Sequence, residues 1–211
     1  MTDPRPTLVI ACGALAREIQ QLKKTNGWHH LQLTCIDATL HNRPRLIPDR
    51  LRSKIRENRD LYDDIFIAYA DCGTGGEIDR IIDEEGIERL PGAHCYQFFA
   101  GEDVFDKLAE EEPGTFYLTD FLARHFHRLV VKALGLDRHP ELRDSYFCNY
   151  KRLVYLSQTT DEELMRAARE AADILGLQFR HVHTAYGDLE KSLRVRFGKR
   201  KNGEENDHLL A

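Results

Sequence analysis

The residues TLVIACG, from Thr7 to Gly13, give the clearest structural signal in the chain. Their continuous apolar and β-branched character predicts a strand that is buried on both faces, as in a parallel sheet. Apolar residues then recur every three or four positions from Leu15 to Leu22, which is typical of an amphipathic helix. Cys12 and Gly13 are therefore predicted to lie at a strand-to-helix turn.

The same alternation continues along the chain. Strands are predicted at residues 31–36, 64–69, 115–118, 153–156 and 179–184. Helices are predicted at residues 48–59, 77–85, 97–111, 120–134 and 160–175. This order predicts an α/β fold that is Rossmann-like, with a mostly parallel sheet flanked by helices, as one body or as two small lobes.

We divide the chain into three expected parts. Residues 1–150 form an α/β domain that carries the cysteine motifs, and residues 151–197 form a C-terminal β-α-β segment that packs on it. Residues 198–211 are expected to be a flexible tail, because they are polar. A helix beginning at residue 160 is expected to carry a capping box, in which Thr160 is followed three residues later by Glu163.

Composition excludes several classes of protein. The net charge is −5 and no dense basic stripe is present, so nucleic acid is not the expected partner. The longest apolar runs fall far short of the roughly 20 residues that cross a bilayer, so we expect no membrane association. The N-terminus lacks the basic and apolar regions of a secretory signal, which predicts a cytoplasmic protein.

The five cysteines raise the main question about function. An odd number in a reducing compartment argues against a disulfide framework. Cys12 and Cys72 follow predicted strands, and Cys95 follows another short element, each with a glycine nearby. Because ligands of α/β sheets bind beyond the carboxyl ends of the strands, these three thiols could hold a metal together. Cys35 and Cys148 are expected to be packing residues.

The spacing alone leaves an alternative open, because no Cys-x-x-Cys motif occurs and cysteines are also common as small buried residues. His41, in a polar loop, and His94 are the candidate fourth ligands. Three thiolates and one histidine are a conventional zinc set, whereas three thiolates alone also suit an iron–sulfur cluster. His41 is expected to act either as a ligand or as a catalytic acid or base.

A glycine-rich run follows the strand at residues 64–69. In it, Asp71, Gly73, Thr74 and Gly75 are predicted to bind an anionic part of a substrate through backbone amides. The run lacks the P-loop and dinucleotide-binding patterns, and a tight turn is the alternative interpretation.

These motifs, taken together, resemble the prokaryotic family called domain of unknown function 1638. The resemblance lies in Val9-Ile10-Ala11-Cys12-Gly13-Ala14-Leu15 with Glu18, Leu40-His41-Asn42-Arg43-Pro44, Tyr69-Ala70-Asp71-Cys72-Gly73, His94-Cys95 with Phe99 and Gly101, and Pro113-Gly114-Thr115-Phe116-Tyr117-Leu118-Thr119. It implies recurring cysteines at Cys12, Cys72 and Cys95 and a recurring histidine at His41. The family pattern has aspartate where this chain has His94.

The resemblance also implies a link to corrinoid-dependent methyl transfer, and so to one-carbon metabolism, because some members are associated with such systems. Our leading hypothesis is a metal-dependent enzyme, a transferase or a lyase, that acts on a small anionic or thiol-containing molecule. The alternative is a non-catalytic accessory protein that binds a corrinoid protein or a methyltransferase. A redox sensor with a single reactive thiol is a third hypothesis.

Overall fold

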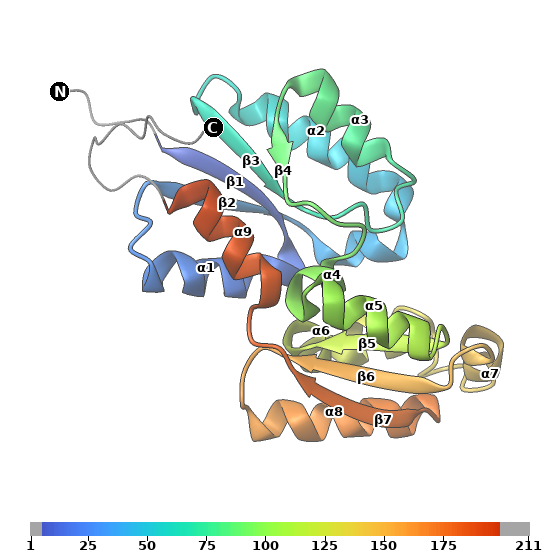
Figure 1. Ribbon diagram of the computed structural model, residues 1–211. Coiled ribbons are helices and arrows are strands. Elements are labelled where there is room, and N and C mark those ends of the chain that lie inside the picture. Colours follow the sequence, from blue (N-terminus) through green and yellow to red (C-terminus); the bar gives the residue numbers. More distant parts are fainter. Residues whose placement is uncertain (1–5, 199–211) are drawn as a thin grey trace.

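The computed structural model describes residues 6–198 and contains two parallel sheets (Figure 1). The first sheet has the order β2-β1-β3-β4, and all of its neighbouring strands run parallel. Its strands are β1 (Thr7–Cys12), β2 (Leu31–Ile36), β3 (Asp64–Ala68) and β4 (Glu88–Arg89). Every residue of β1 is buried, because this central strand is covered on both faces, as its apolar run predicted.

The second sheet has the order β5-β6-β7 and is also parallel. Its strands are β5 (Thr115–Thr119), β6 (Arg152–Ser157) and β7 (Gln178–His183). Together the two sheets confirm the predicted α/β class with parallel strands and flanking helices. Each sheet forms the centre of one lobe.

The first lobe consists of the first sheet and the helices on its two faces. Its helices are α1 (Ala16–Thr25), α2 (Ile47–Asn58), α3 (Glu77–Glu85), α9 (Gly187–Phe197) and the short 3-10 helices η1 (Gly13–Leu15), η2 (Ala38–Asn42) and η3 (Pro44–Leu46). Figure 1 shows α2 and α3 on one face of the sheet and α1 and α9 on the other. The crossover through α1 runs from β1 to β2, whereas those through α2 and α3 run the opposite way across the sheet, from β2 to β3 and from β3 to β4. Because such crossovers are right-handed, α1 lies on one face and α2 and α3 lie on the other.

The second lobe surrounds the second sheet. Its helices are α5 (Glu102–Glu111), α6 (Asp120–Phe126), the π-helical continuation η4 (His127–Lys132), α7 (Leu142–Phe147) and α8 (Glu162–Leu175). One face of the sheet packs on α6 and α8, and the other packs on α5. Helix α4 (Cys95–Ala100) lies between the lobes and contributes buried residues to both cores. None of the helices in the described residues 6–198 is long and apolar enough to cross a membrane.

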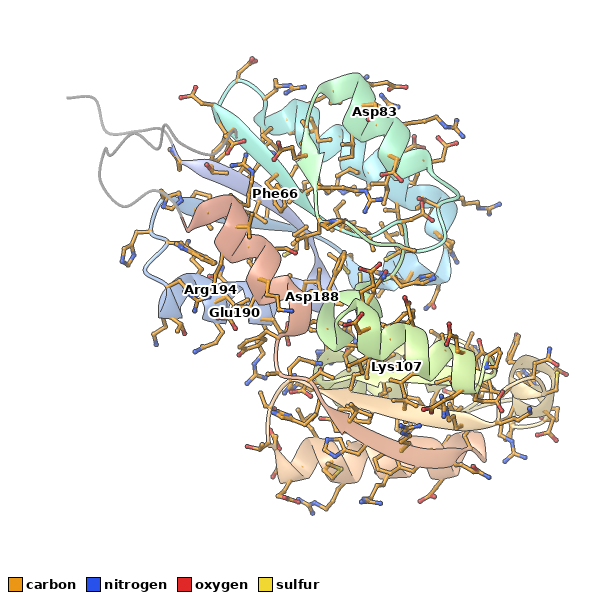
Figure 2. The ribbon with its side chains drawn as sticks, in the orientation of Figure 1. Phe66, Asp83, Lys107, Asp188, Glu190 and Arg194 are labelled. Carbon is orange, nitrogen blue, oxygen red and sulfur yellow. The ribbon has the colours of Figure 1, made fainter. Side chains whose placement is uncertain are left out.

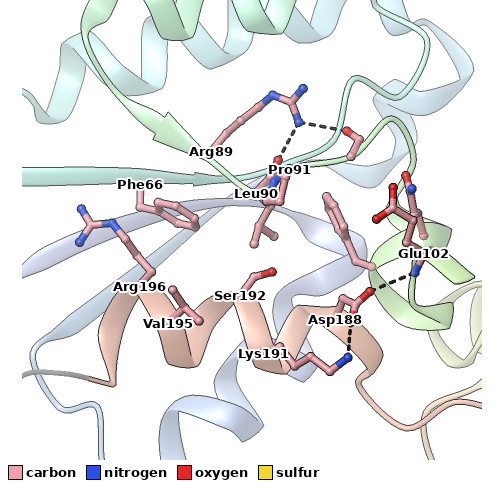
Figure 3. A pocket seen from close by; sticks show the side chains of 13 residues that line it. Phe66, Arg89, Leu90, Pro91, Glu102, Asp188, Lys191, Ser192, Val195 and Arg196 are labelled. Carbon is pink, nitrogen blue, oxygen red and sulfur yellow. Dashed lines mark hydrogen bonds and ion pairs between the residues drawn. The ribbon is translucent and has the colours of Figure 1, made fainter. Parts of the chain in front are cut away.

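The chain crosses between the lobes twice, and the two crossings are joined. It leaves the first lobe at Gly101, between α4 and α5, and it returns through residues 184–187 to α9. The carboxylate of Asp188 accepts a hydrogen bond from the backbone N–H of Glu102 at 3.0 Å and one from Lys191 Nζ at 2.7 Å (Figure 3). Asp188 and Lys191 also line a surface cavity of about 480 Å³ beside α9.

Helix α9 packs on the first sheet through one apolar face. Leu189, Leu193 and Phe197 are buried there, and Phe197 meets the ring of Phe66 edge-on with 5.3 Å between ring centroids. Figure 2 labels Phe66 beside α9 and Glu190 and Arg194 on this helix. The spacing of four residues places the three apolar side chains on one side of the helix.

Several sequence-based predictions need comment at this point. The helix after β6 is capped by Asp161, whose carboxylate accepts the N–H groups of Glu163 and Leu164, so the expected cap at Thr160 was wrong. The boundary expected at residue 150 falls within the second lobe, because β5 pairs with β6. The division into domains stays a prediction, and residues 199–211 of the expected flexible tail lie outside the described residues.

Candidate metal centre

Three cysteines and one histidine reach the same edge of the first sheet from four separate segments. Cys12 is the last residue of β1, and Cys72 lies in the turn after β3. Cys95 is the first residue of α4, and His41 belongs to η2, which follows β2. Because parallel strands end at a common edge, residues far apart in the sequence meet there.

The distances between these side chains are short. The Sγ atoms of Cys72 and Cys95 are 3.3 Å apart. One ligand atom each of His41, Cys72 and Cys95 lies within 4.8 Å of the others. Cys12 Sγ lies 3.9 Å from His41 Nε2. His41, Cys72 and Cys95 therefore form one group of potential ligands, and Cys12 adjoins that group through its contact with His41. We call these four residues the cysteine cluster.

The imidazole of His41 is held in one orientation. Its Nδ1–H donates to the carbonyl oxygen of Ala38 at 2.9 Å, which leaves Nε2 facing the sulfur atoms. Its ring stacks on Tyr69 with 5.8 Å between centroids and 11° between planes. A backbone hydrogen bond to the distal nitrogen is the usual support for a metal-binding histidine, because it fixes both the tautomer and the ring direction.

The charges within the cysteine cluster are coupled. The interaction with Cys95 holds the pKa of Cys12 well below its ordinary value and lowers that of Cys72 to about 6. The same contacts raise the pKa of Cys95 well above the ordinary value. Burial lowers the pKa of His41, but hydrogen bonds and attraction from Cys12 and Cys72 outweigh it and raise the pKa to about 11.

Two local features position the sulfur atoms. Cys12 Sγ accepts the backbone N–H of Ala14 at 3.3 Å, because the chain turns from β1 into η1 at that point. Cys72 has a φ of 49°, a left-handed conformation that is uncommon for a residue other than glycine. Strain of this kind is held only where the surrounding structure requires it, and it occurs often at functional sites.

Two separations between donor atoms in the cysteine cluster are close to those of a zinc site. Tetrahedral zinc with Zn–S bonds of about 2.3 Å places its ligand atoms between about 3.5 and 3.8 Å apart. The observed separations of 3.3 Å and 3.9 Å differ from that range by less than half an ångström. Three thiols and an imidazole nitrogen are also the donor types that zinc prefers.

The glycine-rich turn is organised by its own aspartate. The carboxylate of Asp71 accepts hydrogen bonds from Thr74 Oγ1 at 2.6 Å and from the N–H groups of Gly76 at 2.8 Å and Gly75 at 3.2 Å. An external anion would have to displace this carboxylate to use those amides. The predicted anion-binding role of Asp71, Gly73, Thr74 and Gly75 stays a prediction, and these contacts favour the alternative of a tight turn.

A cavity of about 530 Å³ opens beside the cysteine cluster, between the two lobes. His41, Cys72 and Cys95 line it from the first lobe and from α4, whereas Cys12 is buried beneath them. The opposite wall is apolar and comes from β5, α6, η4 and the turn after η4. Its apolar side chains are Phe116, Phe121, Leu122, Leu129, Val130 and Leu134. A molecule in this cavity would touch sulfur and imidazole on one side and hydrocarbon on the other.

Other candidate residues lie outside the cysteine cluster. His94 lines the cavity, with its ring 6.2 Å from that of Phe105, but it does not belong to the group of potential ligands. Cys35 packs half-buried against the first core, as expected. Cys148 is exposed, with Sγ donating to the carbonyl of Ser145, so the expectation that it packs among aromatic neighbours was wrong.

Tyr69 is a site residue that the sequence analysis missed. It is fully buried, it stacks on His41, and its hydroxyl has no hydrogen-bond partner among the described residues. Burial and the nearby sulfur atoms of Cys12, Cys72 and Cys95 raise its pKa. A protonated phenol beside thiolates is a hydrogen-bond donor held close to the site. Two signals could have found it: its position one residue beyond β3 and its place at the start of the motif Tyr69-Ala70-Asp71-Cys72-Gly73.

The geometry thus defines a two-lobed α/β protein with a cysteine–histidine site at the floor of an interlobe cavity. A family model described as "Protein of unknown function (DUF1638)" matches residues 35–193, and the chain belongs to that family. The resemblance expected from the motifs is confirmed. The matched region includes His41, Cys72 and Cys95, whereas Cys12 precedes it.

Two further comparisons carry no conclusion about function. No curated protein matches the chain. An ornithine carbamoyltransferase from Pyrococcus furiosus is 11% identical, with 85% of this chain and 55% of that chain covered and a TM-score of 0.25. The chain therefore spans about half the length of that protein, and a likeness at this TM-score supports no inference.

Proposed function

We propose that this protein is an enzyme that holds one zinc ion through the thiolates of Cys12, Cys72 and Cys95 and binds a small apolar thiol in the adjoining cavity, at the position that these three ligands leave open. His41 is either a nearby acid or base or a fourth ligand that the substrate thiol would displace. The observation that carries the proposal is the convergence of Cys72, Cys95 and His41, within 4.8 Å of one another, on the wall of that cavity. A buried structural zinc site would have no need of such a cavity.

The mixed donor set supports zinc over an iron–sulfur cluster. His41 Nε2 is directed at the sulfur atoms by the hydrogen bond from Nδ1 to Ala38, and zinc is commonly bound by cysteine and histidine together. An iron–sulfur cluster held by the three cysteines is the alternative, and in that case His41 would act as an acid or base. Cys12, which is buried behind the other ligands, belongs to either set.

The cavity wall favours a thiol over an anionic substrate. No lysine or arginine is among the described residues that line it, and most of its lining is hydrocarbon. Zinc, when bound, lowers the pKa of a coordinated thiol and makes it a nucleophile near neutral pH. The apolar wall would orient the remainder of the substrate and exclude water from the sulfur. If His41 is not a ligand, its raised pKa makes it a proton donor beside the substrate sulfur near neutral pH, and not a base.

The expected link to corrinoid and one-carbon metabolism rests on the family resemblance. In that setting the substrate thiolate would attack the methyl group of a methylated corrinoid; a sulfur–carbon bond would form while the cobalt–carbon bond broke, and the cobalt would keep the electron pair. The partner would be the corrinoid protein or a methyltransferase. The alternative, a non-catalytic accessory protein, requires no metal. A folded and metal-free protein after anaerobic purification would therefore favour the accessory role.

Metal analysis of anaerobically purified protein tests the proposal. We expect about one equivalent of zinc per chain and no visible absorption. Cys72→Ser should lose most of the metal, whereas Cys148→Ser, which changes an exposed cysteine away from the cluster, should retain it. Stoichiometric metal in Cys72→Ser would refute the metal site. Brown protein that contains iron would refute zinc and support the alternative of an iron–sulfur cluster. A separate experiment tests the substrate class. With zinc bound, a small aromatic thiol that occupies the cavity should slow the alkylation of Cys72 by an added reagent.

A further inference from the structure

A second cavity lies at the junction of the two lobes and is lined by polar side chains. Its volume is about 290 Å³. Arg17 and Glu18 reach it from α1, Asp120 and Arg124 reach it from α6, and Thr159 reaches it from the segment after β6. It shares no lining residue with the cavity beside the cysteine cluster, so a ligand here would occupy a separate site.

Glu18 is the least satisfied residue of this cavity. Glu18 is only 4% exposed, and its Oε2 atom has no hydrogen-bond partner among residues 6–198. A buried carboxyl oxygen without a donor is costly, and native structures rarely retain one without a reason. Burial raises the pKa of Glu18, and the charge of Asp120 raises it further. A ligand that donates a hydrogen bond to Oε2 would remove this cost.

Asp120 contributes negative charge to the same cavity but has its own donors. The residue is 2% exposed, and its carboxylate accepts hydrogen bonds from Tyr155 Oη at 2.7 Å and Thr159 Oγ1 at 2.6 Å. The backbone N–H of Gln158 donates to it as well, at 3.0 Å. Its carboxylate is therefore fixed in place, and together with Glu18 it makes the buried part of the cavity acidic.

The exposed part of the cavity is basic. Neither Arg17 nor Arg124 lies within 4.0 Å of a carboxylate oxygen in the portion of the chain that the structure describes, although other arginines, such as Arg89, form ion pairs. Both guanidinium groups are close enough to lower the pKa of Glu18. Their N–H donors suit a carboxylate, which a planar guanidinium can bind through two parallel hydrogen bonds.

We propose that this cavity binds a small zwitterion that carries one ammonium group and one carboxylate group, such as an amino acid. The ammonium group donates to Glu18 Oε2 beside the charge of Asp120, and the carboxylate accepts from Arg17 and Arg124. A simple anion would meet the buried acids, and a simple cation would meet the guanidinium groups, so each would satisfy only half of the cavity. This inference does not depend on the metal site.

Ligand-observed NMR titrations on the full chain test the proposal. Glycine, β-alanine and 4-aminobutyrate are the probes, because they cover three separations between the two charges, and acetate and methylammonium are the singly charged comparisons. We expect at least one of the three zwitterions to bind at least tenfold more tightly than either comparison. Arg124→Gln and Glu18→Gln should each weaken that binding at least tenfold, whereas Arg50→Gln, on the exposed surface of α2, should leave it unchanged.

Three results would overturn the proposal. They are the absence of binding by all three zwitterions, binding of acetate as tight as that of the best zwitterion, and an affinity of Arg124→Gln equal to that of the unmodified protein. If Glu18→Gln fails to fold, Arg17→Gln and Arg124→Gln decide the question, because both change exposed side chains. Zinc content, measured in parallel, should be the same in all variants, which separates this test from that of the metal site.

Discussion

Replacing Gly187 by alanine should weaken the contact that fixes the start of α9 to α4. A Cβ atom on Gly187 would lie 2.3 Å from the carbonyl oxygen of Phe99 and 2.7 Å from that of Phe98. Both are backbone atoms, which cannot swing aside as a flexible side chain can. Gly187 also has a φ of 48°, in the left-handed region that residues with a Cβ atom adopt reluctantly.

The size of the effect follows from these two features. A left-handed conformation costs a residue with a Cβ about 1–2 kcal/mol. Overpacking against neighbours that cannot move adds about 1–3 kcal/mol. The expected loss in the free energy of unfolding is therefore about 2–5 kcal/mol, a large share of the roughly 5–15 kcal/mol of an ordinary domain. Gly135 offers a matched control, because its φ is 74° and a Cβ atom added there would have no neighbour within 4 Å among the described residues, so only the conformational cost applies.

Urea denaturation followed by circular dichroism measures both variants, with the slope m checked for two-state behaviour. Gly187→Ala should lose more stability than Gly135→Ala by about 1–3 kcal/mol. Equal losses in the two variants would show that the close approach of α9 to α4 does not exist as described, and the placement of the two lobes would need revision.

Two further predictions concern the cysteine cluster and the second lobe. In metal-free protein, the rate of Cys72 alkylation should rise with pH with a midpoint near pH 6, because Cys95 and His41 lower the pKa of Cys72 to about 6. His41→Gln should move this midpoint upward. An unchanged midpoint would argue against the interaction between His41 and Cys72. Since this pKa lies below the ordinary value of 9.0, the thiolate stabilises the fold above pH 9, and that contribution is lost as the pH falls through 6. Tyr155→Phe should lower the free energy of unfolding by about 1.5–3 kcal/mol, because it removes a hydrogen bond to the buried carboxylate of Asp120. Chemical denaturation measures that loss, and a neutral result would show that water replaces the hydroxyl.

Local patterns in the sequence were sufficient to predict the fold class and the elements that carry the cysteines. The apolar run of β1 and the turn at Cys12 depend on neighbours in the sequence, and both were predicted correctly. The same holds for the turn that contains Cys72. The convergence of these residues with Cys95 was a weaker inference, because it depends on strand order, which is set by contacts between distant segments.

The features that the sequence did not predict depend on tertiary structure. The break between the two sheets arises because β5 pairs with β6 and not with β4, and no local pattern encodes that choice. Helix α9 carries apolar residues at intervals of four, but no helix was predicted over residues 187–197. The stacking of Tyr69 on His41 joins two loops that are distant in the sequence, so only the folded chain shows it.

The joined crossings at Gly101 and Gly187 have a consequence for access to the cysteine cluster. Because Asp188 ties the second crossing to Glu102 beside the first, the lobes share a single hinge. Any widening of the cavity between them must rotate one lobe about that hinge, with torsional changes confined to a few residues. Both sheets would keep their hydrogen bonds during such a rotation. The cysteines of the first lobe would stay together while the hydrocarbon wall of the second lobe moved away and opened the cavity to a ligand.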